Sequence, residues 1–182
     1  MHRRIQRSMW KKISLGVGVV ILLIGEWSLA LAQHCDGQAE QQLLQMLNLE
    51  RARAGLPSLK VDDRLTQAAR AHSVRMARAK QLSHQLPDEP PLSKRLAATN
   101  IRFNADAENV AYDYSLQAAH EGLMQSPRHR DNILSPGYNA VGIGVLRSGD
   151  LFWVTQDFAD NMLEKAAGII AESARKMGVE VV

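Results

Sequence analysis

Apolar residues recur at helical spacing in the segment that begins at residue 38. Over residues 38–54, leucine and methionine side chains fall three and four residues apart, at Leu43, Met46 and Leu47. This spacing places them on one face of an α-helix. Gly55, a residue type that caps helix C-termini, marks the predicted end.

Further helices are predicted before this pattern changes. A second helix, at residues 63–80, carries one apolar stripe, formed by Leu65, Ala68, Ala69, His72 and Met76. A short third helix, "LSKRLAA", follows a proline-rich loop. A fourth is predicted at residues 115–125, where Ser115 is a suitable N-cap.

The pattern changes to strand-like runs after residue 138. The segment "NAVGIGVLRSGDLFWVTQDFA" has two such runs around "RSGD", which predicts a β-hairpin. Helices around a small, mainly antiparallel sheet predict an α+β fold, layered as a helix–sheet–helix (α-β-α) sandwich. Residues 161–177 return to helical spacing, and we expect their apolar stripe to pack on the same domain rather than on another chain; it comprises Leu163, Ala167, Ile170, Ala174 and Met177.

The first 32 residues have the three parts of a secretory signal peptide. A basic start, "MHRRIQRSMWKK", precedes the apolar "ISLGVGVVILLIG", and Ala30 and Ala32 occupy the positions that a signal peptidase recognises. We therefore expect cleavage after Ala32 and a secreted or periplasmic protein. The alternative is a membrane anchor formed by an uncleaved signal, although Glu26 and the short apolar run argue against a stable transmembrane span.

Removal of residues 1–32 changes the charge of the protein. The full chain has 22 Lys and Arg against 19 Asp and Glu, but residues 33–182 keep 17 basic and 18 acidic residues. The basic excess thus belongs to the predicted signal, and a nucleic-acid partner loses its main support. The remainder divides into a short flexible N-terminus (33–37), one domain (38–160), and a C-terminal helix and tail (161–182).

The histidines differ in what their positions predict. His34 lies in the short N-terminus and carries little weight. His72 lies on the apolar stripe of the second helix, which favours a buried, hydrogen-bonded core residue over a ligand. His120 stands beside Glu121 in the fourth helix, and we expect it on the solvated surface.

His84 and His129 are stronger candidates, because each lies at the end of a helical segment where side chains can face a cleft. Glu108 lies between them in "AENVAY". Two imidazoles and a carboxylate can bind a divalent metal such as Zn²⁺, with water at the fourth position. Without metal they can perform general acid–base chemistry. Their separations, 24 and 21 residues, match no local metal motif.

The order of several motifs resembles the CAP domain, also called the SCP domain. This family takes its name from cysteine-rich secretory proteins, antigen-five allergens and plant pathogenesis-related proteins. The resemblance is closest to its short, cysteine-poor bacterial branch and covers about residues 40–159, including Asn48 and Arg51. The matching segments are "LNLERARAGLPSLKVDDRLTQAARAHSVRMARAKQLSH", "AENVAY", "SPRHRDNIL", "YNAVGIGV" and "FWVTQDFA".

The resemblance implies a central cleft with two histidines and two acidic residues. It matches the histidines, which bind zinc or another divalent cation in several members, to His84 and His129. It matches the first glutamate to Glu108, with Asn109 beside it. Gln156 resembles a polar residue that supports the cleft; a plain strand-end hydrogen bond is the alternative.

The second family glutamate has no counterpart in this sequence. Its position falls close to Ser126, and Glu121 lies about one helical turn away. The resemblance therefore implies a triad of His84, Glu108 and His129 rather than a set of four groups.

Three functions remain open. The resemblance favours a binding module at the bacterial cell envelope, whose partner is a small molecule, a lipid, a cell-wall component or a protein. A zinc-dependent hydrolase is the second, with Glu108 as third ligand or general base, although no G-x-S-x-G nucleophile pattern is present. The third is a structural polar network. Self-association through Cys35, the only cysteine, or through the C-terminal helix is a further expectation.

Overall fold

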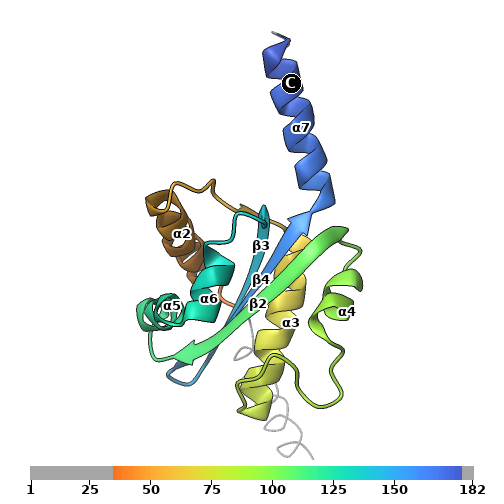
Figure 1. Ribbon diagram of the computed structural model, residues 1–182. Coiled ribbons are helices and arrows are strands. Elements are labelled where there is room, and N and C mark those ends of the chain that lie inside the picture. The colour runs from red at the N-terminus through yellow and green to blue at the C-terminus, as the bar shows by residue number, and fades with distance from the viewer. Residues whose placement is uncertain (1–34, 178–182) are drawn as a thin grey trace, which may run out of the picture. The chain divides into compact units, whose positions relative to one another are not determined.

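The computed structural model describes residues 35–177, so the predicted signal peptide lies outside the described residues. Helices and strands keep the labels of Figure 1, which begin at α2. The elements, in chain order, are α2 (Gly37–Arg53), β1 (Lys60–Val61), α3 (Asp63–Ala79), α4 (Leu92–Ala97), β2 (Phe103–Asp113), α5 (Leu116–Gln125), α6 (Pro127–Ile133), β3 (Ala140–Ser148), β4 (Leu151–Asn161) and α7 (Met162–Lys176).

The strands form one four-stranded sheet in the order β1-β3-β4-β2. β3 and β4 make the predicted hairpin, and β2 pairs antiparallel with β4. Only the two-residue strand β1 runs parallel to its neighbour, so the mainly antiparallel sheet is confirmed. β2 therefore lies at one edge of the sheet.

Helices cover both faces of this sheet, as Figure 1 shows. α2, α5 and α6 lie on one face, where the core includes Leu43, Leu47, Leu123, Ile133 and Phe158. α3 and α4 lie on the other face, where the core includes Leu65, Met76, Leu96 and Trp153. The predicted α-β-α sandwich is confirmed.

Two glycines of β3 allow α3 to lie directly against the sheet. A Cβ atom at Gly142 would collide with the backbone between Leu65 and Thr66, and one at Gly144 would collide with the backbone at Ala69. The "VGIGV" motif is thus a packing requirement, because larger residues would push α3 outward. This close packing fixes the position of α3 on the sheet, and His84 lies in the loop that follows this helix.

Helix ends agree closely with the sequence pattern. Ser115 caps α5 through a hydrogen bond to the Ala118 N–H, as predicted. Ala54 is the C-cap of α2, and Gly55 follows it with φ 72°, one position later than expected. The pattern did not predict α6, a seven-residue helix with Pro127 at its first position.

The two ends of the described chain differ from expectation. Part of the segment predicted to be a flexible N-terminus is ordered by backbone contacts. Cys35 pairs with Leu146 in an isolated antiparallel β-bridge, and the Asp36 side chain caps α2, so residues 35–37 belong to the folded domain. The predicted apolar stripe of α7 is largely exposed and does not pack on the domain. Leu163, Ile170 and Met177 are 55%, 63% and 71% exposed, whereas Ala174 of the same stripe is buried. Self-association stays a prediction.

No helix between residues 35 and 177 has the length and apolarity that a membrane crossing requires.

Candidate functional site

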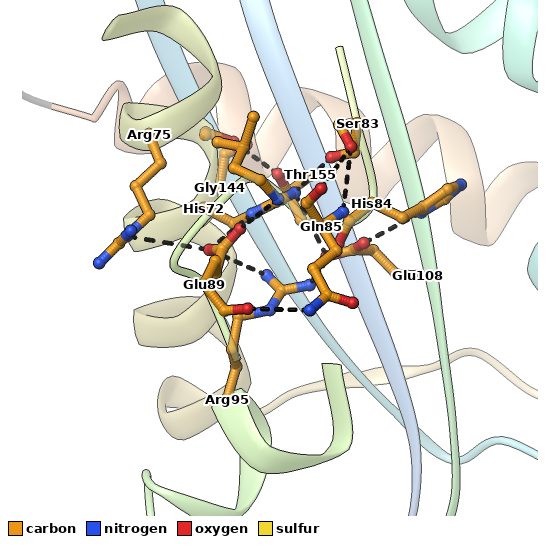
Figure 2. A network of polar contacts seen from close by, with 12 residues as sticks. His72, Arg75, Ser83, His84, Gln85, Glu89, Arg95, Glu108, Gly144 and Thr155 are labelled. Atoms are coloured by element: carbon orange, nitrogen blue, oxygen red, sulfur yellow. Dashed lines mark hydrogen bonds and ion pairs between the residues drawn. The ribbon is translucent and has the colours of Figure 1, made fainter. Parts of the chain in front are cut away.

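Glu108 lies near the middle of the edge strand β2 with its side chain buried beneath the loop that follows α3 (Figure 2). Its Oε1 lies 3.0 Å from Nδ1 of His84. Its Oε2 accepts a 2.6 Å hydrogen bond from Nη2 of Arg95, in α4. Both carboxyl oxygens therefore have a strong partner.

The surroundings of Glu108 favour its ionised form. Burial by itself would raise the pKa of this carboxyl group, but the hydrogen bond from His84 and the positive charge of Arg95 outweigh burial and lower the pKa. Glu108 is thus a carboxylate at neutral pH. Its two oxygens are already engaged, so it is a weak proton acceptor.

His84 presents its imidazole at the surface. The side chain is 57% exposed, and the bond from Nδ1 to Glu108 leaves Nε2 as the free ring nitrogen. Such a carboxylate–histidine pair fixes the ring orientation and makes Nε2 a better electron-pair donor. The backbone is held as well, because Nη2 of Arg95 donates to the His84 carbonyl at 3.2 Å.

His72 supports the same loop from below and is fully buried, as predicted. Its Nε2 lies 2.8 Å from the carbonyl oxygen of Ser83, and its Nδ1 lies 2.9 Å from Oε1 of Glu89. A carbonyl can only accept, so Nε2 carries a proton. The contact to Glu89 is a second hydrogen bond, so the ring is held from both of its nitrogens.

His129 reaches the site from the opposite layer, in α6. Its ring centroid lies 6.3 Å from that of His84, with the ring planes tilted by 42°. Burial, and secondarily the nearby His84, lower the pKa of His129, which keeps its imidazole neutral at neutral pH. Arg128 and Arg130 are exposed on either side of it.

Asn109 anchors the helix that carries His129. Strand alternation turns it to the face opposite Glu108, where its Nδ2 donates to the His129 carbonyl at 3.1 Å and to Oε1 of Gln156 at 3.2 Å. Nδ2 of Asn132, also in α6, donates to Oδ1 of Asn109 at 2.8 Å. Asn109 and Gln156 therefore position His129 from inside the molecule and do not line the exposed part of the site.

Arg51 holds the far end of α6. It is fully buried, and its Nη1 donates to the carbonyls of Ile133 and Ser135, each at 2.8 Å. Its Nε donates to the Pro57 carbonyl at 2.8 Å. A charged donor that satisfies several helix-end and loop carbonyls is worth more than a neutral one, so this residue stabilises the position of α6.

Three residues of the site were missed from sequence. Arg95 lies in the short helix predicted from "LSKRLAA", and Glu89 lies in the proline-rich loop before it. Asp157 lies opposite Glu108 on β4 and is fully buried. The sequence signal for Asp157 was weak, since it consisted only of a position next to Gln156 in a predicted strand. The β2–β4 register, which the sequence does not contain, is needed to see that Asp157 lies opposite Glu108.

The expectation for His120 is wrong. This residue is 4% exposed and packs in α5 beside Ala119 and Leu123. His120 follows Leu116 by four residues and precedes Leu123 by three, so it falls on the helix face that packs toward the core. Glu121 is exposed and accepts a hydrogen bond from Gln117, away from the site.

Within residues 35–177, no group of three or more His, Cys, Asp or Glu side chains is arranged to hold a metal ion. The Glu108 carboxylate contacts Nδ1 of His84 and the guanidinium of Arg95, so it supports the imidazole of His84 from the side opposite Nε2. The metal-ligand candidates of this site are thus the imidazoles of His84 and His129.

Comparison with known proteins agrees with the fold and the motif order. Residues 44–158 match the CAP family, described as the cysteine-rich secretory protein family, and the chain belongs to this family. A solved structure of an extracellular protein with an SCP domain, from Bacillus anthracis, is 28% identical with a TM-score of 0.64; the match covers 69% of this chain and 41% of that one.

Two curated proteins of Bacillus subtilis (strain 168) are also similar. The uncharacterized protein YkwD is 30% identical over 120 residues, which is 65% of this chain and 46% of that protein. The uncharacterized membrane protein YlbC is 33% identical over 121 residues, which is 66% of this chain and 34% of that protein. The chain thus spans less than half the length of these relatives.

Proposed function

We propose that this protein is exported and that its His84–Glu108–His129 site binds a small ligand, a lipid or a cell-wall component at the bacterial envelope. The observation that carries the proposal is the approach of two imidazoles from opposite helical layers over the edge strand β2. Buried groups, including Glu108 and Asn109, hold both histidines in place. A structural network alone would have no need to expose the His84 ring.

These two rings are the residues of the site that could hold a divalent cation such as Zn²⁺, because imidazole nitrogens are common zinc ligands and the ring centroids lie 6.3 Å apart. Nε2 of His84 and a ring nitrogen of His129 would hold the ion, which would supply a Lewis acid to an anionic or carbonyl ligand. Glu108 would orient His84 from behind.

The same geometry argues for binding rather than hydrolysis. A general base needs a free oxygen and a pKa near the working pH. In Glu108 both oxygens are engaged and the pKa is lowered. The second carboxyl group, Asp157, is fully buried behind it.

Zinc titration by calorimetry tests the site. The parent is the full chain with His2→Ala, His34→Ala and Cys35→Ser, which removes the competing histidines and the cysteine that precede α2. We expect saturable binding that is lost in His84→Ala and in His129→Ala but kept in Arg130→Ala, an exposed neighbour on α6. Binding that survives in either histidine variant, while circular dichroism shows a native fold, would overturn the metal site.

Export is supported by the predicted signal peptide and by the extracellular relative from Bacillus anthracis. N-terminal sequencing of the protein from fractionated cells tests it directly. Gln33 as the first residue, in the secreted or periplasmic fraction, is the expected result. An intact N-terminus in the membrane fraction would instead establish the anchored alternative.

A further inference from the structure

We propose that the groove between α3 and α4 is a second binding site, for a phosphate or carboxylate group of a small molecule. This groove has a volume of about 290 Å³ and lies next to the buried network of Figure 2. Its lining includes Arg75 from α3 and Lys94 and Arg95 from α4. This proposal does not depend on the His84–His129 site.

Arg95 provides the first reason to expect an anion. Its side chain is only 8% exposed, and a single nitrogen, Nη2, makes its hydrogen bonds to Glu108 and to the His84 carbonyl. Nε and Nη1 are buried and have no hydrogen-bond partner within residues 35–177. Buried guanidinium donors are rarely left unpaired, and a phosphate or carboxylate oxygen is the acceptor that they match best.

The charge around the groove points the same way. Arg75 and Lys94 add two exposed cations at its rim. The carboxylate in the lining, Glu89, is hydrogen-bonded to His72 at 2.9 Å, and its contacts to Arg75 and Arg95 are longer, at 3.9 Å and 3.8 Å. The charge of Arg95 is paired with the buried carboxylate of Glu108, so the positive charge available to an anion comes from Arg75 and Lys94 at the rim.

The size and the walls of the groove limit the ligand. Alanines from both helices, Ala68, Ala71 and Ala98, form apolar walls. Pockets with apolar walls and a few convergent polar groups are typical of small-molecule sites. The structure thus favours an anion attached to a compact organic group, rather than a polymer backbone.

Nuclear magnetic resonance of the full chain tests this site, with inorganic phosphate and acetate as separate probes at constant ionic strength. The buried Nε–H of Arg95 is the reporter. We expect a saturable shift of this resonance, with affinity reduced on the order of three- to tenfold in Arg75→Gln and in Lys94→Gln. Lys165→Gln, which removes one charge from α7, is the matched control.

Each outcome decides the proposal. Saturation by phosphate alone identifies a phosphorylated ligand, and saturation by acetate as well identifies a carboxylate ligand. A shift that fails to saturate, or an equal loss of affinity in Lys165→Gln and Lys94→Gln, would show that the anion responds only to the overall charge of the protein. Either result would overturn the site.

Discussion

Asp157 faces Glu108 across two neighbouring antiparallel strands, and both carboxyl groups are buried. Neither oxygen of Asp157 has a hydrogen-bond partner among the described residues, and burial, together with the negative charge of Glu108, raises its pKa well above the ordinary value. Asp157 is therefore the protonated member of the pair. Its hydroxyl can donate to Glu108, whose carboxylate also accepts from His84 and Arg95.

Asp157→Asn should stabilise the protein at pH 8 and have little effect near pH 4. A carboxyl group with a raised folded-state pKa costs stability as soon as the pH rises above the unfolded-state pKa, because only the unfolded chain then ionises. The asparagine amide can still donate to Glu108 but never ionises. Urea unfolding at the two pH values measures the difference, which should grow by about 1.4 kcal/mol for each pH unit between the unfolded-state and folded-state pKa.

Asp157→Ala is the control, since it removes the donor and leaves a cavity and should destabilise at both pH values. An Asp157→Asn variant that is equally destabilised at both pH values would show that Asp157 is ionised in the folded protein.

Arg95→Met should destabilise the fold by roughly 3–5 kcal/mol, because it leaves the buried carboxylate of Glu108 without its cation. Adding Glu108→Gln should restore much of this loss, since an amide carries no charge to compensate. The double-mutant cycle, measured by urea unfolding, isolates the coupling between the two side chains. Purely additive effects would mean that the 2.6 Å contact contributes nothing to stability.

Two substitutions of the same type should have opposite effects. Gly144→Ala should cost more than about 3 kcal/mol, because the new methyl group meets the backbone of α3 and cannot be accommodated by a side-chain rotation. In Gly122→Ala, in α5, the new methyl group would meet no atom of another described element within 4 Å, and the substitution should stabilise by about 0.5–1 kcal/mol through helix propensity. Thermal unfolding of both variants tests the role of close α3–β3 packing, and equal melting temperatures would contradict it.

The sequence predicted the layers of the fold because local signals were strong. Periodicity located α2, α3 and α5, and the "RSGD" turn located the β3–β4 hairpin. The pattern did not predict α6, because a seven-residue helix offers too few turns for an apolar stripe. The apolar stripe of α7 was predicted from its spacing, but its exposure depends on tertiary packing, which the spacing of apolar residues does not determine.

The candidate site was only partly predictable. His84, Glu108 and His129 came from motif order, and the structure brings the rings and the carboxylate together. The supporting groups depend on tertiary pairing: Asp157 on strand register, and Arg95 on the packing of α4 against the loop. His72 was expected in the core, but its bond to the Ser83 carbonyl, which holds the His84 loop, could not be inferred from a helical stripe.

His72→Leu should loosen the loop that carries His84 while α3 stays folded. The substitution places an apolar side chain in the core but removes the bond to the Ser83 carbonyl and leaves Glu89 without its hydrogen bond to His72. We expect a loss on the order of 2–4 kcal/mol, mostly from the unpaired buried carboxylate. Adding Glu89→Gln should therefore recover part of the stability but none of the loop order.

Amide hydrogen exchange separates these two effects. The Leu86 amide, which donates to Glu89 in the native loop, should exchange faster in His72→Leu, whereas the Met76 amide, which is in α3 itself, should change only with global stability. Zinc affinity should fall in the same variant because His84 is no longer held in one orientation. Unchanged exchange at Leu86 would mean that Arg95 alone positions the loop, through its bond to the His84 carbonyl.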